Sequence, residues 1–334
     1  MSNNNKTFAE IVEDFNDSAI LSFNAQYKEY EPALKNLAFK YNSGSISQSN
    51  FFINLLLTQV EEWKGTQEYD NIDEVIKQSV VNKEYLVRGK EFPVRDFKRA
   101  EQANSITGLD MYNKGVAALS KAAADAPYNV MLKALRAGAG TTLGACFDGE
   151  PLFSTSHAFS NVSGSQSNLI AGSGISTPLL ISDVQSAMAA MEGFSYSINA
   201  GSADDDDTRM LNEAPQYVIL CNPALASKLR DISRLNTIVV DSSGGSQDNP
   251  LKGTFEVVTR HIDTANVNDY YIIDVSEATV KPFLIAIEDE GSLITPQDNP
   301  EALSNQQSLR YAYNGLSFGN AYGAWWKITK INNT

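Results

Sequence analysis

The sequence predicts an α+β fold organised around one long helix, and three observations carry that prediction. Apolar side chains recur every three or four residues from Ile106 to Ala137, which is the spacing of one buried helix face. Short apolar runs typical of strands alternate with helical patterns between residues 178 and 280. Strand-like sequence then returns from Lys281 onward, so the first and last parts of the chain are expected to share a domain into which 178–280 is inserted.

The long helix is expected to begin after Ser105, a favourable N-cap residue, and to end before Gly138. At about 1.5 Å per residue, roughly 32 residues would span about 48 Å. Pro127 removes a backbone donor and costs about 3 kcal/mol inside a helix, so we expect a kink or a restart near Ala126. Two ordinary helices joined at residues 125–127 are the alternative.

The chain before this helix divides into two parts of opposite charge. Residues 1–74 carry twelve acidic residues and five lysines, whereas residues 77–99 carry seven basic and three acidic ones. Patches of opposite sign on one chain suit self-association. Apolar residues alternate loosely with charges over residues 66–104, which predicts a half-exposed hairpin with its turn at residues 88–90. A hairpin that is simply solvated is the plainer alternative.

Residues 1–65 predict an extended arm with a little helix. The low-complexity link at residues 42–50 separates its first part from an apolar stretch, residues 51–63, that suits a short helix or a buried strand. The scattered aromatic residues do not close a core of their own, so the arm must pack against something else. A neighbouring subunit and the arm's own domain are equally good candidates.

Composition excludes several functional classes. A net charge of −14 and a pI near 4.6 argue against wrapping free nucleic acid, because binding to phosphates needs a basic surface. Two distant cysteines, Cys146 and Cys221, suggest neither a disulfide framework nor a zinc site. The polar first residues do not resemble a signal peptide, and the longest apolar run, residues 51–57, is too short to span a bilayer.

No catalytic, cofactor or metal site is predicted. His157 follows three hydroxyl-bearing residues, but the sequence has no nucleophile elbow, so a structural histidine that donates to the backbone is expected. The glycines at 138, 140 and 144 follow a helix rather than a strand, which is the wrong context for dinucleotide binding. The acidic run at residues 204–207 lacks calcium-loop spacing and is expected to be a solvated loop tip.

The segment FDGEPLFSTSH, residues 147–157, resembles a motif of major capsid proteins of tailed phages, most closely the Mu-like major head subunit family. Further stretches agree in the same order: YVIL followed by NPAL, DYYIID followed by KPF, then RYAYNG and AYGAWWK. The resemblance covers roughly residues 66–330, and the shared order carries it because each motif alone is weak. Residues 1–65 match in position only.

The resemblance implies an HK97-type capsid fold and a structural, non-enzymatic protein. The parts that it implies are an N-terminal arm (1–65), an extended hairpin called the E-loop (66–104), a peripheral domain (105–177 and 281–334, with a spine helix at about 105–138) and an axial domain (178–280). Loops near residues 201–214 and 241–253 would then meet at the ring centres.

By the same resemblance, copies of the chain would form hexamers and pentamers of an icosahedral shell around double-stranded DNA, without reading its sequence. An acidic inner wall would keep the genome from sticking. The portal protein would be one partner, and separate scaffolding or decoration proteins would be others, since the arm lacks the long charged helix of a cleaved scaffolding domain. Assembly in the host cytoplasm would place the protein in the virion. No cofactor, membrane contact or subunit cross-link is expected.

The basic hairpin is expected to contact the acidic region of a neighbouring subunit, with ion pairs setting the register and apolar burial providing affinity. Its contact residues would be Lys83, Tyr85, Arg88, Lys90, Phe92, Arg95 and Phe97. The arm and the acidic partners would contribute Phe8, Phe15, Phe23, Glu61, Glu62, Asp70 and Glu74.

Two other functions fit the residues. An encapsulin-like compartment would use the same fold to enclose enzymes, and DNA inside purified particles would distinguish a phage head from it. A soluble enzyme built on residues 178–280 would stay a small oligomer, which size-exclusion chromatography would reveal.

Overall fold

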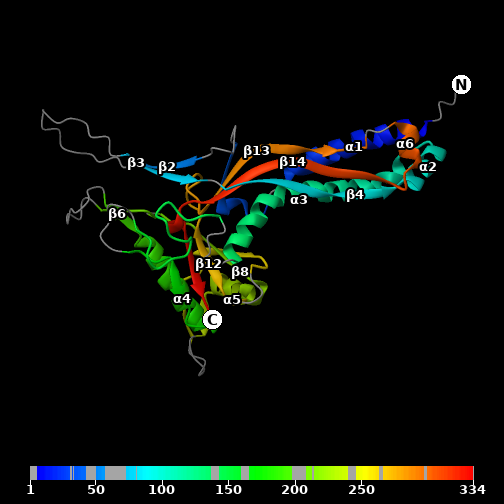
Figure 1. Cartoon of the computed structure of the whole chain (residues 1–334). Helices are drawn as coiled ribbons and strands as arrows, with labels where there is room; N and C mark the ends of the chain where they lie inside the picture. The colour runs from blue at the N-terminus through cyan, green and yellow to red at the C-terminus, as the bar shows by residue number, and fades with distance from the viewer. Residues whose placement is uncertain are drawn as a thin grey trace, which may run out of the picture.

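The computed structural model describes residues 6–30, 32, 34–42, 50–56, 73–79, 81–136, 143–158, 165–197, 208–212, 214–239, 246–262, 266–296 and 299–333. For residues 50–56, 73–79 and 81–88 it describes the backbone alone. The α+β class predicted from the sequence is confirmed, and the elements form an elongated part and a sheet-based part joined at one end (Figure 1).

The elongated part, which we call the blade, is built on a four-stranded sheet. Its strand order is β1-β13-β14-β4, with β1 parallel to β13 and the other pairs antiparallel. The strands are β1 (Ala38–Asn42), β4 (Val81–Pro93), β13 (Phe283–Ile294) and β14 (Ser308–Tyr322). At about 3.3 Å per residue, the 15 residues of β14 extend roughly 50 Å.

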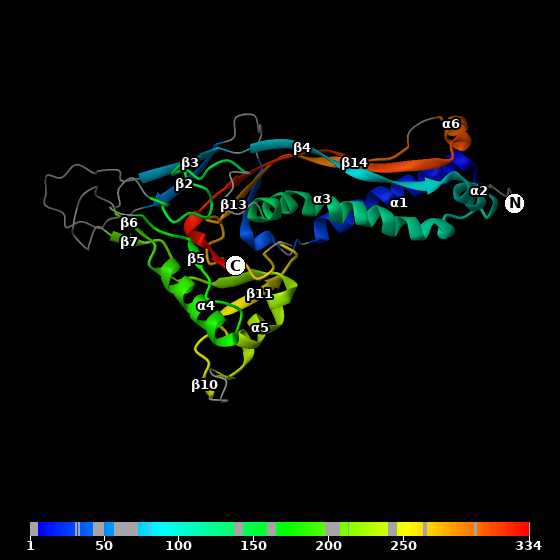
Figure 2. The same cartoon turned by 60° about the horizontal axis from the view of Figure 1, so that its bottom comes forward.

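Two long helices lie side by side along one face of the blade (Figures 1 and 2). They are α1 (Phe8–Glu29) and α3 (Asp110–Arg136), and the short helices α2 (Val94–Gln102) and α6 (Pro300–Asn305) close the far end. Helix α1 begins with a capping box, in which Thr7 and Glu10 each bond to the backbone of the other. The predicted extended arm is therefore wrong for this segment, which is a 22-residue helix.

The predicted long helix is present as α3, a single element of 27 residues that continues through Pro127. The predicted restart near Ala126 is wrong. A one-turn 3-10 helix, Thr107–Leu109, precedes α3, so the regular helix begins later than expected. Tertiary packing outweighs the penalty of the proline, because Pro127 is buried against the blade and its carbonyl accepts a hydrogen bond from Asn320 Nδ2 at 3.1 Å.

Two predicted turns are instead continuous strand. Strand β4 passes straight through Gly89, where a Cβ would lie 2.7 Å from the carbonyl oxygen of Tyr311, so the glycine permits close approach of β14. Strand β14 likewise passes through Gly315, which lies against Gly291 of β13. Both of these glycines have positive φ, +83° and +71°, and they mark an irregularity in the ladder rather than a chain reversal.

The sheet-based part, which we call the sheet unit, has the strand order β11-β8-β12-β15-β5. These strands are β5 (Leu169–Ala171), β8 (Tyr217–Cys221), β11 (Phe255–Thr259), β12 (Tyr270–Asp274) and β15 (Ile328–Asn332). Helices α4 (Thr177–Glu192) and α5 (Pro223–Arg234) pack on the sheet unit. Two small ribbons complete it: β6 (Ser195–Ser197) with β7 (Thr208–Met210), and β9 (Thr237–Val239) with β10 (Ser246–Asp248).

The predicted domain boundaries differ from the observed elements in two places. The sheet unit is wider than residues 178–280, because β5 and the C-terminal strand β15 pair into its sheet. The hairpin also begins earlier than residue 66: β2 (Asn50–Leu56) pairs antiparallel with β3 (Asp73–Ser79). The rest of the predicted hairpin, β4 and α2, belongs to the blade. In both views the β2–β3 hairpin extends away from the blade, opposite to α2 and α6 (Figures 1 and 2).

Candidate assembly surface

Helix α1 is fixed to its own chain by aromatic packing. The ring of Phe15 meets Phe97, Tyr311 and Phe92 edge-on at centroid distances of 5.3, 5.4 and 6.2 Å. Phe23 stacks on Tyr313 at 5.0 Å. Such ring pairs add about 0.5–1.5 kcal/mol beyond the burial of their area.

This packing corrects the predicted roles of five aromatic residues. Those rings are almost inaccessible within the single chain: Phe8 (8% exposed), Phe15 (1%), Phe23 (3%), Phe92 (6%) and Phe97 (0%). A side chain enclosed by its own core has no surface with which to contact a neighbouring subunit. Of the two packing partners left open for the arm, the structure has its own domain.

Hydrogen bonds also hold α1 in place. The backbone amide of Phe8 donates to Glu101 Oε1 at 2.9 Å, and the hydroxyl of Tyr311 donates to Asn16 Oδ1 at 2.6 Å. Asn113 of α3 donates to the hydroxyl of Ser18 at 3.0 Å. The partners lie on α2, β14 and α3, so α1 is attached along much of its length.

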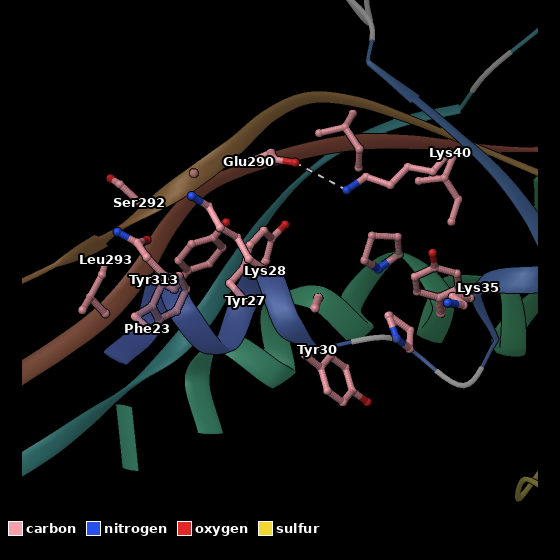
Figure 3. Close-up of a pocket in the computed structure, with 18 of the residues that line it drawn as sticks. Phe23, Tyr27, Lys28, Tyr30, Lys35, Lys40, Glu290, Ser292, Leu293 and Tyr313 are labelled. Atoms are coloured by element: carbon pink, nitrogen blue, oxygen red, sulfur yellow. Dashed lines mark hydrogen bonds and ion pairs between the residues drawn. The ribbon is translucent and has the colours of Figure 1, made fainter. Parts of the chain in front are cut away.

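Where α1 ends, the blade opens into a concave surface that we call the groove (Figure 3). Its volume is about 650 Å³, a size typical of binding concavities. The C-terminal half of α1, the segment that leads into β1, the middle of α3 and the Gly291 region of β13 form its walls. Aromatic rings line it, namely Phe23, Tyr27, Tyr30, Tyr128 and Tyr313.

The rim of the groove is basic although the chain as a whole is acidic. Lys28, Lys35 and Lys40 are exposed at the rim, and Glu290 is the one carboxylate among the lining residues that the structure describes. Lys40 Nζ lies 3.4 Å from Glu290 Oε1, and both side chains are about half exposed (Figure 3). An exposed pair of this kind contributes about 0–1 kcal/mol, so the rim remains available to other anions.

The tyrosines of the groove stay neutral. Burial, together with the nearby carboxylate of Glu290, raises the pKa of Tyr27, and burial raises that of Tyr313 well above its ordinary value. At the outer edge, the Tyr30 hydroxyl donates to Asp125 at 3.0 Å, and Lys121 lies 5.1 Å from the centre of the Tyr30 ring. The groove thus combines an aromatic floor with a cationic rim.

The predicted basic contact residues do not form one patch. Lys90 is exposed on β4 near the far end of the blade, and Arg95 is exposed on α2 with its Nε 3.6 Å from Asp96 Oδ1. Lys83 lies at the other end of β4, where its backbone pairs with Phe318. Tyr85 pairs with Leu316 in the same ladder, and Arg88 follows on that strand.

Of the predicted acidic partners, Glu74 lies on β3, and its backbone pairs with Leu55. Glu61, Glu62 and Asp70 fall outside the described residues. Contact of the acidic and basic residues with a neighbouring copy stays a prediction.

A second group of charges is buried where the blade meets the sheet unit, and sequence analysis missed it. Lys327 Nζ lies 2.7 Å from Asp274 Oδ2, and these side chains are 1% and 0% exposed. Burial would raise the pKa of Asp274, but the hydrogen bond from Lys327 and those from the amides of Ser276 and Gln216 outweigh it and lower the pKa. The only sequence signal was a lysine set directly after two tryptophans.

His157 occupies a structural position, as expected. Its Nε2 donates to the carbonyl oxygen of Leu152 at 3.1 Å, and its Nδ1 lies 2.7 Å from Asp148 Oδ2. The imidazole stacks on Trp325 with the ring centres 4.3 Å apart and the planes 3° from parallel. The motif at residues 147–157 therefore closes a loop onto the core at the junction.

The described residues hold no group of three or more histidine, cysteine, aspartate or glutamate side chains that could bind a metal ion. Among these residues, no helix is both long enough and apolar enough to cross a bilayer. Cys146 and Cys221 are free thiols, and burial raises the pKa of both, that of Cys221 to about 11. Neither thiol is suited to nucleophilic chemistry at neutral pH.

Comparison with known proteins identifies one family. The family described as Mu-like prophage major head subunit gpT matches the chain over residues 12–191. This match takes in α1, which the sequence motifs had covered by position alone, and it ends with α4. No curated protein matches the chain.

Solved structures with a similar arrangement share little sequence with the chain. The procapsid protein of bacteriophage JBD30 is 14% identical with a TM-score of 0.48, covering 97% of this chain and 75% of that one. A protein of Mycobacterium phage Patience is 13% identical with a TM-score of 0.48, covering 99% and 89%. The virus-like particle of Pyrococcus furiosus is 10% identical with a TM-score of 0.42, covering 94% and 98%.

Proposed function

The chain belongs to the family of Mu-like prophage major head subunits, and on that premise we propose that its copies form the hexamers and pentamers of a phage head. It is a structural capsid protein of an icosahedral shell. The proposal adds the arrangement of the copies and the contents of the shell. The observation that supports it most is the family match over residues 12–191, which spans α1, the hairpin and most of the blade.

The shape of the chain supports the proposal. A closed shell needs a subunit that contacts neighbours on several sides, and heterologous contacts of this kind close into rings. The blade, roughly 50 Å long, and the β2–β3 hairpin extend in opposite directions from the sheet unit (Figure 1). Each therefore offers a contact surface at a distance from the core, while the sheet unit is left to face a ring centre.

Charge supports double-stranded DNA as the content. With a net charge of −14, the shell wall would repel phosphates and let the genome move during packaging and ejection. The protein would line the head without reading the DNA sequence. A portal protein and separate scaffolding or decoration proteins would be its partners, and assembly would take place in the host cytoplasm. The role requires no catalysis.

Electron microscopy of the purified full-length chain tests the shell. We expect closed particles of uniform diameter that contain rings of six and five subunits. A chain that remains a small oligomer over a range of concentration and salt would contradict the proposal.

The content is tested on particles isolated from the phage-producing host and treated with nuclease. Protected double-stranded DNA is expected. Enclosed enzyme without DNA would contradict that part of the proposal and favour a protein compartment.

A further inference from the structure

We infer that the groove receives the acidic link between β2 and β3, residues 57–72, from a neighbouring copy of the chain. The inference rests on the proposed function, because it concerns a contact made within the shell. It names both the receiving surface and the segment that occupies it. The sequence-based prediction paired the same acidic residues with β4 and α2 instead.

Charge complementarity supports this occupant. The link LTQVEEWKGTQEYDNI carries four acidic residues and one lysine. The groove carries three lysines at its rim and one glutamate. In a chain of net charge −14, a lysine-rich concavity is the exception, and it attracts a segment of the opposite sign.

The apolar residues of the link match the floor of the groove. Trp63 and Tyr69 are interleaved with the acids of the link, and the floor presents Phe23, Tyr27 and Tyr313. Aromatic anchors in concave sites provide most of the affinity in protein interfaces, whereas rim ion pairs set register and on-rate. A segment that carries both kinds of residue suits an aromatic floor with a cationic rim.

The direction of the hairpin indicates that the link comes from another copy. In both views β2 and β3 lead away from α1 and α3, which form two walls of the groove (Figures 1 and 2). Each strand has seven residues and extends about 23 Å, so a return to the same chain would require reversal of the whole hairpin. A neighbour placed along the ring meets the link without such a reversal.

Disulfide cross-linking between two variants tests the contact. A tagged Ser292→Cys chain, changed in the groove, is mixed with an untagged Glu62→Cys chain before assembly, and the particles are then oxidised. We expect a dimer that contains one tagged and one untagged chain. The native thiols Cys146 and Cys221 are buried and stay unreactive. Asn305→Cys, exposed at the far end of the blade, is the matched control and should give no dimer with Glu62→Cys.

The same particles separate this inference from the proposed function. Closed particles without the mixed dimer would overturn the inference and leave the shell intact. A cross-link found only within one chain, in a double variant diluted with wild type, would also overturn it. If no particles form from wild type, the proposed function itself fails.

Charge reversal gives an independent test. Lys28→Glu with Lys40→Glu should reduce the yield of particles at least tenfold at low salt, while Lys133→Glu, an exposed lysine on α3, should leave it unchanged. Adding Glu61→Lys and Glu62→Lys to the first variant should restore most of the yield. Circular dichroism establishes that each variant folds.

Two results would refute the charge argument. One is normal assembly of the groove variant, whose particles then hold less DNA; that result would assign the lysines to nucleic acid. The other is failure of the compensating lysines to restore any yield although the variant is folded.

Discussion

The junction and the groove treat charge in opposite ways. At the junction, Lys327 and Asp274 lie 2.7 Å apart and are at most 1% exposed. At the groove, Lys40 is 42% exposed beside Glu290, and at the far end of the blade Arg95 is 75% exposed. The charges of the junction are neutralised inside one chain, whereas those of the blade are left at its surface.

This difference separates what folds the chain from what joins copies of it. A buried pair that loses one partner leaves an uncompensated charge, so the junction tolerates little change. An exposed charge loses almost nothing when altered, so changes at the groove should act on assembly and spare the fold. The buried apolar residues form one continuous core through blade and junction, which makes the single chain a stable unit.

The largest expected effect is at the junction. Lys327→Met leaves Asp274 buried without its partner and should lower the free energy of unfolding by about 3–5 kcal/mol. Urea denaturation measures the change. Glu277→Gln is the control, because Glu277 also lies 2.7 Å from Lys327 but is 49% exposed, and it should cost under about 1 kcal/mol. Equal losses in the two variants would contradict the contrast.

The next effect concerns α1. Phe15→Ala removes a ring that is 1% exposed and should cost about 3–5 kcal/mol. Leu21→Ala on the same helix, where the side chain is 70% exposed, should stay within about 0.5 kcal/mol. Thermal unfolding compares them. If Phe15→Ala were as stable as Leu21→Ala, α1 would not be part of the core.

Acid should weaken the junction before it affects the groove. The pKa of Asp274 is lowered below its ordinary value of 3.8 in the folded chain, so the stability it provides is full above that value and is lost as pH falls through the folded pKa. One such group gives a slope of at most about 1.4 kcal/mol per pH unit. Urea midpoints measured below pH 4 should therefore fall less steeply in Asp274→Asn than in wild type. Identical slopes would mean that Asp274 is not the acid-sensitive group.

The smallest effect on folding is expected on β4 and α2. Reversing Arg88 and Arg95 to glutamate should block assembly yet change the free energy of unfolding by no more than about 0.5 kcal/mol. Particle counts by microscopy and urea denaturation are compared on one preparation. Wild-type yields of particles from this variant would refute the role of these arginines between subunits.

Local patterns predicted the elements that pack on one chain. Strand β8, helix α5 and the long α3 follow from apolar runs, Pro at the first helical turn and three-to-four spacing. Helix α1 was missed although its signals were present, since Thr7 and Glu10 form a capping box and Phe8, Phe15 and Phe23 lie on one face. Treating that segment as an arm for a neighbour outweighed its own periodicity.

Long-range contacts set the features that the sequence did not reveal. Gly89 and Gly315 suggested turns, but both lie in long strands where a second strand approaches closely. The pairing of Lys327 with Asp274 joins residues 53 positions apart, and the groove is assembled from four separate elements. Nothing in the local spacing of these residues specifies such contacts.

Hydrogen exchange of assembled particles and dissociated subunits tests the account most directly. We predict that the amides of β8 and β12 are equally protected in both states, because the sheet unit is complete in one chain. The hairpin and the groove rim from Lys28 to Lys40 should gain protection only in particles. Hairpin amides that are already fully protected in dissociated subunits would contradict the claim that this part is completed by a neighbouring copy.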